Sequence, residues 1–128
     1  MRAAESCPKV RTDLVQRHAG DELLIYDLNN DQVACLDANA AAVWELADGT
    51  LTTPELAAAI GQPDEAGELI VTHALGLFAT EGLLEGDGLV SRRVALSRSA
   101  LLAAGVAAAA IPTLKSAIAP NAALARVS

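Results

Sequence analysis

Between positions 32 and 49 the spacing of apolar residues changes from every second position to every third or fourth. Val33 and Cys35 alternate with Gln32 and Ala34, and this period of two predicts a β-strand. From position 40 the period becomes that of an amphipathic helix, with the apolar residues Ala40, Val43, Trp44 and Ala47. The segment between them offers Asp37 or Asn39 as the N-cap. The chain is therefore predicted to pass directly from a strand into a helix.

Two runs upstream predict further strands. Residues 10–18 alternate in polarity, and residues 23–28 form a second apolar run. Gly20-Asp21 marks the turn between the two runs, and Asn29-Asn30-Asp31 marks the turn before the third strand, since these side chains tolerate turn backbone. We expect three consecutive antiparallel strands in a small meander.

A second helix is predicted to begin near Thr52. The sequence supports either a capping box of Thr52 with Glu55 or a Thr53 cap with Pro54 in the first turn. Gly61-Gln62-Pro63 should end this helix.

A third and longer helix is predicted over about residues 66–80, followed by a short extended return. Its core stripe is Val71, Ala74, Leu75 and Phe78. A neighbouring stripe consists of Ile70, His73 and Leu77. The apolar face is thus wider than one packing contact requires, and surplus apolar surface is where a ligand could bind.

The composition indicates one domain with an appendage. The chain has 128 residues, of which 52% are hydrophobic but only 2% aromatic, so the core should be built from Leu, Val, Ile and Ala. The first 87 residues hold all sixteen acidic residues and four of the nine basic ones, a net charge of −12, whereas the remainder holds five basic residues and no acidic one. An acidic body therefore precedes a basic, apolar tail.

The two cysteines, Cys7 and Cys35, are far apart in the sequence and show no metal-ligand spacing. We expect both to be free thiols in a reduced, cytoplasmic setting, since no N-terminal secretory signal is found. No metal site or cofactor is predicted.

Several short motifs occur in the same order as these predicted elements. They are Leu36, Asn39, Ala42-Val43-Trp44-Glu45-Leu46, Asp48-Gly49, Thr53, Glu55-Leu56 and Gly82-Leu83-Leu84. Three strands, three helices and these motifs together resemble the PqqD-like family, named after pyrroloquinoline quinone biosynthesis protein D. The resemblance covers roughly residues 8–86. It implies an α+β, winged-helix-like recognition domain at 8–88, after a loose N-terminus at 1–7 and before an extension at 89–128 that is helical or disordered.

The resemblance also implies a function. Such proteins are non-catalytic chaperones that bind the leader of a ribosomally made precursor peptide and present it to a modifying enzyme, often a radical S-adenosylmethionine protein. The leader adds as a strand beside the third strand and lies against the third helix. Carried onto this chain, the peptide-binding residues are Gln32, Val33, Ala34, Cys35, Leu36, Ile70, His73, Ala74 and Leu77.

Strand addition is also physically reasonable, because an open strand edge offers unpaired N–H and C=O groups to any extended peptide. The wide stripe on the third helix would supply the discrimination between peptides, and acidic neighbours such as Asp27, Asp31 and Glu68 would favour a basic leader. The alternative is that residues 32–36 form an interior strand, covered by the tail or by another subunit. An open edge would equally allow a homodimer.

Catalysis and DNA binding find little support in the sequence. His73 has no second ligand or acid at suitable spacing, which is typical of a packed or surface histidine, and no paired carboxylates, nucleophile triad or phosphate loop is present. A winged-helix DNA-binding regulator would need basic residues on its recognition helix, whereas residues 66–80 contain none. We expect no enzyme activity and no nucleic-acid partner.

The tail allows three interpretations. Arg92-Arg93 followed by the apolar run 100–111 is similar to a twin-arginine export signal at the wrong end of a chain, and Pro112 and Lys115 interrupt the run too early for a membrane span. Residues 91–119 could lie on a membrane surface, which would make the protein a peripheral adaptor at the inner membrane face. They could instead dock on a partner or on the groove of another copy, mimicking a leader. The third interpretation is a helix packed on its own domain or a disordered tail.

Overall fold

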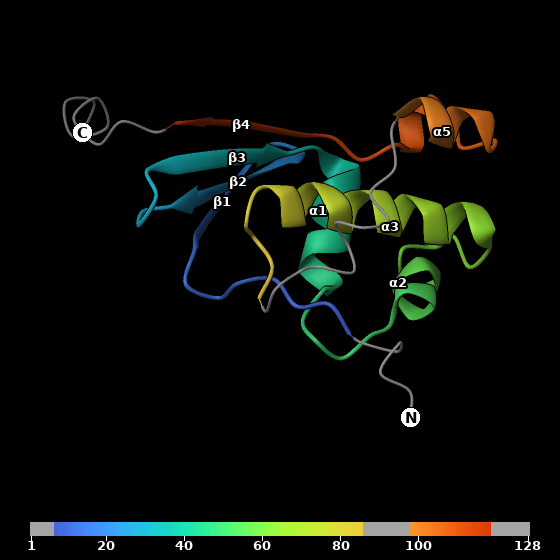
Figure 1. Ribbon diagram of the computed structural model, residues 1–128, viewed down its shortest axis with the longest axis horizontal. Coiled ribbons are helices and arrows are strands. Elements are labelled where there is room, and N and C mark those ends of the chain that lie inside the picture. Colours follow the sequence, from blue (N-terminus) through green and yellow to red (C-terminus); the bar gives the residue numbers. More distant parts are fainter. Residues whose placement is uncertain (1–6, 86–97, 119–128) are drawn as a thin grey trace.

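The protein is an α+β fold in which a helical layer covers one face of an antiparallel sheet (Figure 1). The computed structural model describes residues 7–85 and 98–118. The elements are β1 (Val15–Ala19), β2 (Glu22–Asp27), β3 (Gln32–Leu36), α1 (Ala38–Leu46), α2 (Thr53–Ala59), α3 (Glu65–Thr80), α5 (Arg98–Ala103), the 3₁₀ helix η1 (Ala108–Ala110) and β4 (Leu114–Ile118).

The sheet has four strands in the order β1-β2-β3-β4, and every neighbouring pair is antiparallel. The predicted three-strand meander is present as β1 to β3, and the third strand has the predicted bounds. The prediction of a three-stranded sheet is wrong, because the C-terminal extension contributes β4 beside β3. The described part of the extension is therefore neither wholly helical nor disordered.

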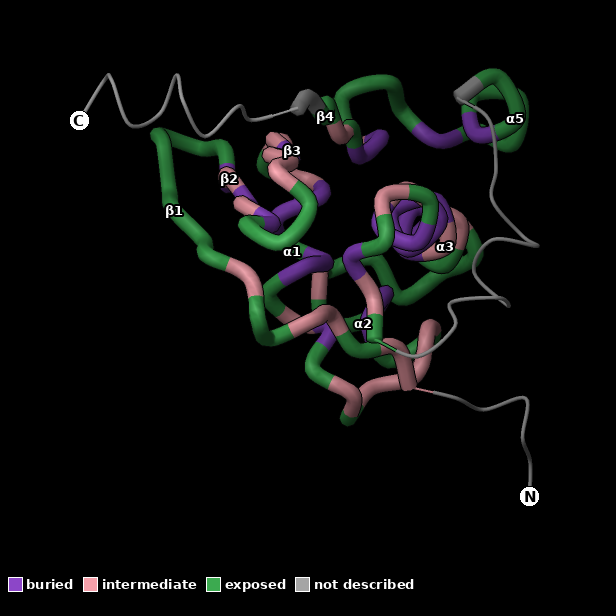
Figure 2. Tube along the Cα trace, turned by 60° about the vertical axis from the view of Figure 1, so that its left-hand side comes forward, coloured by how far each residue is buried: buried purple, intermediate pink, exposed green. Residues whose placement is uncertain are grey.

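The inner face of the sheet is set by the pleat of β2 and β3. Leu23 and Ile25 on β2 pair with Leu36 and Ala34 on β3, and all four are buried. Val33 and Cys35, the alternating pair that signalled the strand, point to the opposite face and are only partly buried. β1 is exposed along its whole length, as Figure 2 shows.

The helix starts follow the capping signals. Asp37 caps α1, and its side chain accepts a hydrogen bond from the Ala40 N–H at 2.8 Å. At α2 the capping box of Thr52 with Glu55 is formed. Asp64 caps α3 through the Gly67 N–H. Each cap satisfies a backbone donor that the first turn leaves without a partner.

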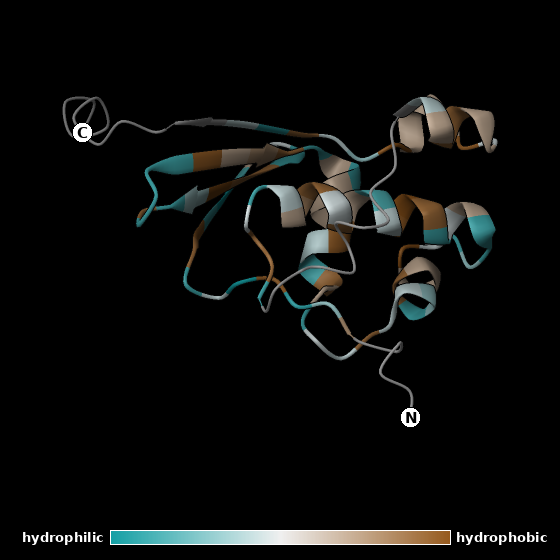
Figure 3. Cartoon of the chain, viewed as in Figure 1, coloured by the Kyte–Doolittle hydropathy of each residue, from teal (hydrophilic) through white to brown (hydrophobic). Residues whose placement is uncertain are grey.

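The main core lies between the sheet and the three helices α1, α2 and α3. Trp44 and Phe78 meet edge to face at its centre, with ring centroids 5.2 Å apart and an interplanar angle of 88°. The predicted core stripe of α3 is buried at all four positions, Val71, Ala74, Leu75 and Phe78. Figure 3 shows hydrophobic positions, in brown, along β2, β3 and α3.

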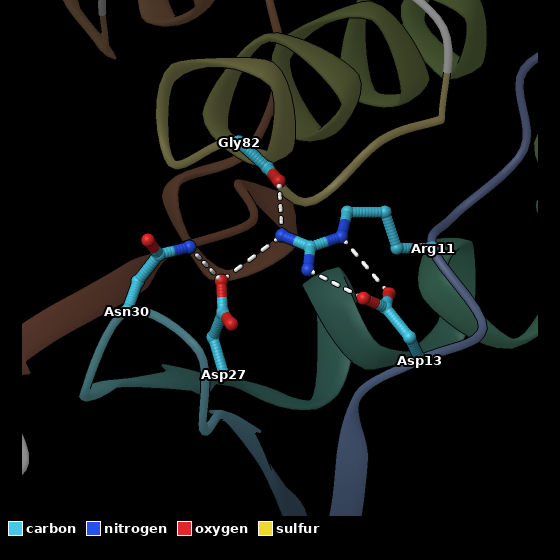
Figure 4. Close-up of polar contacts among 5 residues, drawn as sticks. All are labelled: Arg11, Asp13, Asp27, Asn30 and Gly82. Atoms are coloured by element: carbon cyan, nitrogen blue, oxygen red, sulfur yellow. Dashed lines mark hydrogen bonds and ion pairs between the residues drawn. The ribbon is translucent and has the colours of Figure 1, made fainter.

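Arg11 ties the segment before β1 to the sheet and to the end of α3 (Figure 4). Its guanidinium donates to Asp27 at 2.9 Å, to the Gly82 carbonyl at 3.0 Å and to Asp13 at 2.8 and 3.0 Å. Asn30 also donates to Asp27. Burial alone would raise the pKa of Asp27, but these hydrogen bonds outweigh burial and lower it.

The described part of the extension packs against its own domain. Leu101, Val106 and Ile111 are buried with Ile70 of α3 in a second hydrophobic cluster. These are the residues that a membrane-surface role would expose to lipid. A bilayer crossing needs about 20 apolar residues in one helix, and no helix within the described ranges meets that requirement. Arg92-Arg93 and residues 1–6 lie outside the described residues.

Candidate functional site

The strand proposed as the working edge, β3, is covered by β4 over its full length. The register runs from Leu36 opposite Leu114 to Gln32 opposite Ile118. β3 is therefore an interior strand, and the expectation of an open edge at residues 32–36 is wrong for this chain. The occupant is the chain's own tail.

The tail becomes a strand at this point because of Ile111 and Pro112. A residue before proline is disfavoured in the helical region, and Ile111 is extended, with φ −77° and ψ 121°. This ends η1 and directs the chain along β3. Both residues are buried, so they fix where β4 begins.

Asp37 joins the start of β4 to the start of α1. Its N–H donates to the Thr113 carbonyl at 3.2 Å, and the Thr113 N–H donates to Asp37 Oδ1, also at 3.2 Å. The same oxygen caps α1 through Ala40. Asn39, the other candidate cap, instead donates from Nδ2 to the Ala109 carbonyl at 2.7 Å. Asp37 and Asn39, which follow β3, thus both form hydrogen bonds with the tail.

The surplus stripe of α3 is where the tail packs. Ile70 is only 4% exposed and belongs to the second cluster. His73 and Leu77, further along the stripe, line an open pocket of about 200 Å³ whose other wall is residues 111–114. The tail thus runs along both the predicted stripe and β3. We call the surface that it covers, the edge of β3 together with Ile70, His73 and Leu77, the β3–α3 groove.

Ala74 is the exception among the helix positions. It is fully buried in the main core, so its side chain cannot reach a peptide in the β3–α3 groove. The side chains of Ala34 and Leu36 are also in the main core, and these two residues could contribute to peptide binding through their backbone.

The tail does not fill the groove completely. Besides the pocket at His73, a second one of about 90 Å³ is lined by Asn39, Ile70 and Ala110, among others. The tail lines the first pocket with residues 111–114 and the second pocket with Ala110 alone. The second pocket leaves space beside Ala110 for a larger side chain.

Cys35 lies on the outer face of the sheet, opposite Lys115 of β4. Its thiol donates to Glu22 Oε1 at 3.3 Å. Burial raises the pKa of the Cys35 thiol, and the Glu22 carboxylate adds to the effect. Cys35 and Cys7 are both free, and a raised pKa makes Cys35 a poor nucleophile.

Sequence reasoning missed the residues that the tail contributes. Leu101, Val106 and Ile111 recur every five positions, which matches no regular helix or strand. Residues 114–118, Leu-Lys-Ser-Ala-Ile, do not alternate in polarity, so no period of two marked this strand. Within residues 7–85 and 98–118, no three His, Cys, Asp or Glu side chains are grouped to hold a metal ion.

In this structure the tail supplies both the strand that pairs with β3 and the apolar side chains that pack on Ile70 of α3. Comparison with models of known protein families, with curated proteins and with solved structures finds no match to this chain. The likeness to PqqD-like proteins therefore depends on the motifs of the sequence and on the order of its elements.

Proposed function

We propose that this protein is a non-catalytic peptide chaperone. It binds the leader of a ribosomally made precursor peptide by strand addition to β3 and presents the peptide to a modifying enzyme. Residues 8–88 act as a winged-helix-like recognition domain, with β1 to β3 as the wing and α1 to α3 as the helical unit.

The pairing of β3 with β4 is the observation that carries the proposal. Five residues of β3 pair with a segment that comes from the other end of the chain. The backbone of β3 thus accepts an added antiparallel strand in a defined register, and main-chain hydrogen bonds of this kind are available to a peptide of any sequence.

The α3 side of the groove provides selectivity. Ile70 is buried by apolar side chains of the tail, while His73 and Leu77 line the open pocket. Burying a side chain of the size of Leu or Ile contributes about 1.5–3 kcal/mol. A leader with apolar residues at matching positions would therefore be preferred over a polar one by orders of magnitude in affinity.

The charge of the body favours a basic leader. Residues 1–87 carry a net charge of −12, from sixteen acidic and four basic residues. Glu68 is exposed on α3, on the same helix as the groove stripe. Complementary charge speeds association and disfavours acidic peptides.

Titration of the ¹⁵N-labelled full-length protein with synthetic leaders of short reading frames encoded beside its gene tests this function. The expected result is saturable shifts of the backbone amides of residues 32–36 and 70–77. A scrambled leader of equal composition is the control. Shifts confined to other residues would refute the site, and no binding by any leader would refute the function.

A further inference from the structure

We propose that residues 98–118 are a built-in, exchangeable ligand of the β3–α3 groove, which an external peptide must displace. This inference rests on the proposed function, because it assigns the regulation of the same groove. The tail would hold the groove closed until a peptide of better fit replaces it.

The tail can leave without opening the main core. The main core cluster is built from residues between Leu23 and Leu83, and of the tail only Leu114 packs at its border. Leu101, Val106 and Ile111 belong to the separate second cluster. Displacement of the tail therefore uncovers Ile70 and its neighbours but leaves the Trp44–Phe78 contact covered.

The polar contacts of the tail are few and replaceable. Asp37 continues to cap α1 through Ala40 when Thr113 departs. The β3 groups that pair with β4 would pair with the incoming strand in the same way. Exchange of one strand for another thus leaves no buried donor or acceptor without a partner.

Incomplete filling of the groove gives an external peptide its advantage. The pocket of about 90 Å³ lies beside Ala110, and the pocket of about 200 Å³ lies beside residues 111–114, of which Thr113 is exposed. A peptide with larger apolar residues at these two positions would make contacts that the tail lacks. The favoured ligand is therefore an extended, apolar and basic segment with bulkier side chains than the tail.

The tether strengthens the tail as a competitor. Residues 86–97 keep Arg98 covalently attached to Glu85, so the tail competes within its own molecule, at an effective concentration that is on the order of a millimolar for tethered modules. A free peptide with the tail's own sequence then half-saturates the intact protein only at about a millimolar, however tightly the groove binds it.

Cutting the tether provides the test. A protease site placed within residues 86–97 of the full-length protein allows the tether to be cut after folding, and the probe is a fluorescent peptide of residues 98–118. At about 10 µM protein, cutting should lower the half-saturating concentration roughly 100-fold, since the tail then competes only at the protein concentration. The same value before and after cutting would overturn the inference.

Two adjacent leucines give a matched pair of variants in the uncut protein. Leu101 is fully buried in the second cluster, whereas Leu102 is 45% exposed. Leu101→Asn should improve probe binding at least tenfold, because it weakens the tail and not the groove, and Leu102→Asn should leave it unchanged. Equal effects of the two variants would count against the inference.

The outcomes separate this inference from the proposed function. If the tail peptide exchanges but no precursor leader binds, the inference stands and the leader-binding function fails. If a leader binds the uncut protein while the β4 amides keep their shifts, leader binding stands, but strand addition to β3 and this inference both fail.

Discussion

Asp37 and Thr113 are joined by two hydrogen bonds of 3.2 Å, one from each backbone N–H, although they are 76 positions apart in the sequence. Oδ1 of Asp37 accepts both the Thr113 N–H and the N-terminal turn of α1 through Ala40. One carboxylate thus fixes the start of a helix and the start of the strand that closes the groove. The junction between β3 and α1 is where the scaffold and the tail meet.

Replacement of Asp37 by alanine should weaken both the start of α1 and the attachment of β4. Loss of an N-cap costs about 1 kcal/mol, and the Thr113 N–H loses its acceptor as well. We expect the free energy of unfolding to fall by about 1–2 kcal/mol in urea titrations, with faster hydrogen exchange of the β4 amides. Asp37→Asn is the control, since asparagine caps nearly as well; an equal loss in both variants would contradict this explanation.

Removal of residues 98–128 should leave the rest folded. The main core does not depend on Leu101, Val106 or Ile111, so the fluorescence of Trp44 should stay that of a buried tryptophan. Uncovering Ile70 should lower stability by about 2–4 kcal/mol, given about 1.5–3 kcal/mol per buried apolar side chain less the chain entropy regained. Cooperative unfolding monitored by Trp44 fluorescence checks this, and an unfolded truncated protein would contradict the separation of the two clusters.

Gly67→Ala should be destabilising even though alanine is the better helix former. A Cβ at position 67 would lie 1.7 Å from the Gln62 carbonyl oxygen, so α3 or the turn before it must shift. Overpacking of this kind costs about 1–3 kcal/mol, more than the roughly 1 kcal/mol gained in helix propensity. Thermal unfolding compared with Glu68→Ala, an exposed site in the same turn, measures the effect. Unchanged stability of the Gly67→Ala protein would show that the turn adapts freely.

Stability should depend on pH through Asp27. Because its pKa in the folded state lies below the ordinary value of 3.8, the carboxylate stabilises the fold above about pH 4, and this contribution is lost as the pH falls below that value. Asp27→Asn should therefore cost about 2 kcal/mol at neutral pH, and this cost should diminish steadily below pH 4. Urea titrations at several pH values check this; a cost that is constant with pH would contradict the assignment to charge.

The regular spacing of apolar residues along the sequence was enough to predict β3, α3 and the core around Trp44. The caps at Asp37 and Thr52 followed from local hydrogen-bonding chemistry, although Asp37 and Asn39 could not be separated in advance. β4 could not be found in this way, because residues 114–118 do not alternate in polarity and because pairing with β3 is a long-range relationship. The wide apolar face of α3 at Ile70 and Leu77 did indicate that some other segment or molecule covers this helix.

Cys35 on β3 allows a reversible disulfide to be built between β3 and β4. Lys115 is directly opposite Cys35, and opposite residues of an antiparallel pair lie within the Cα separation that a disulfide spans. Lys115→Cys, in a protein that also carries Cys7→Ser and the cut tether, would lock β4 onto β3 when oxidised and release it when reduced.

The decisive measurement is the binding of the labelled 98–118 peptide to this protein in its two redox states. If the β3–α3 groove is the peptide site, the reduced protein at about 10 µM is half-saturated at roughly its own concentration, and the oxidised protein does not bind. Equal binding in both states would place the peptide elsewhere and contradict the account.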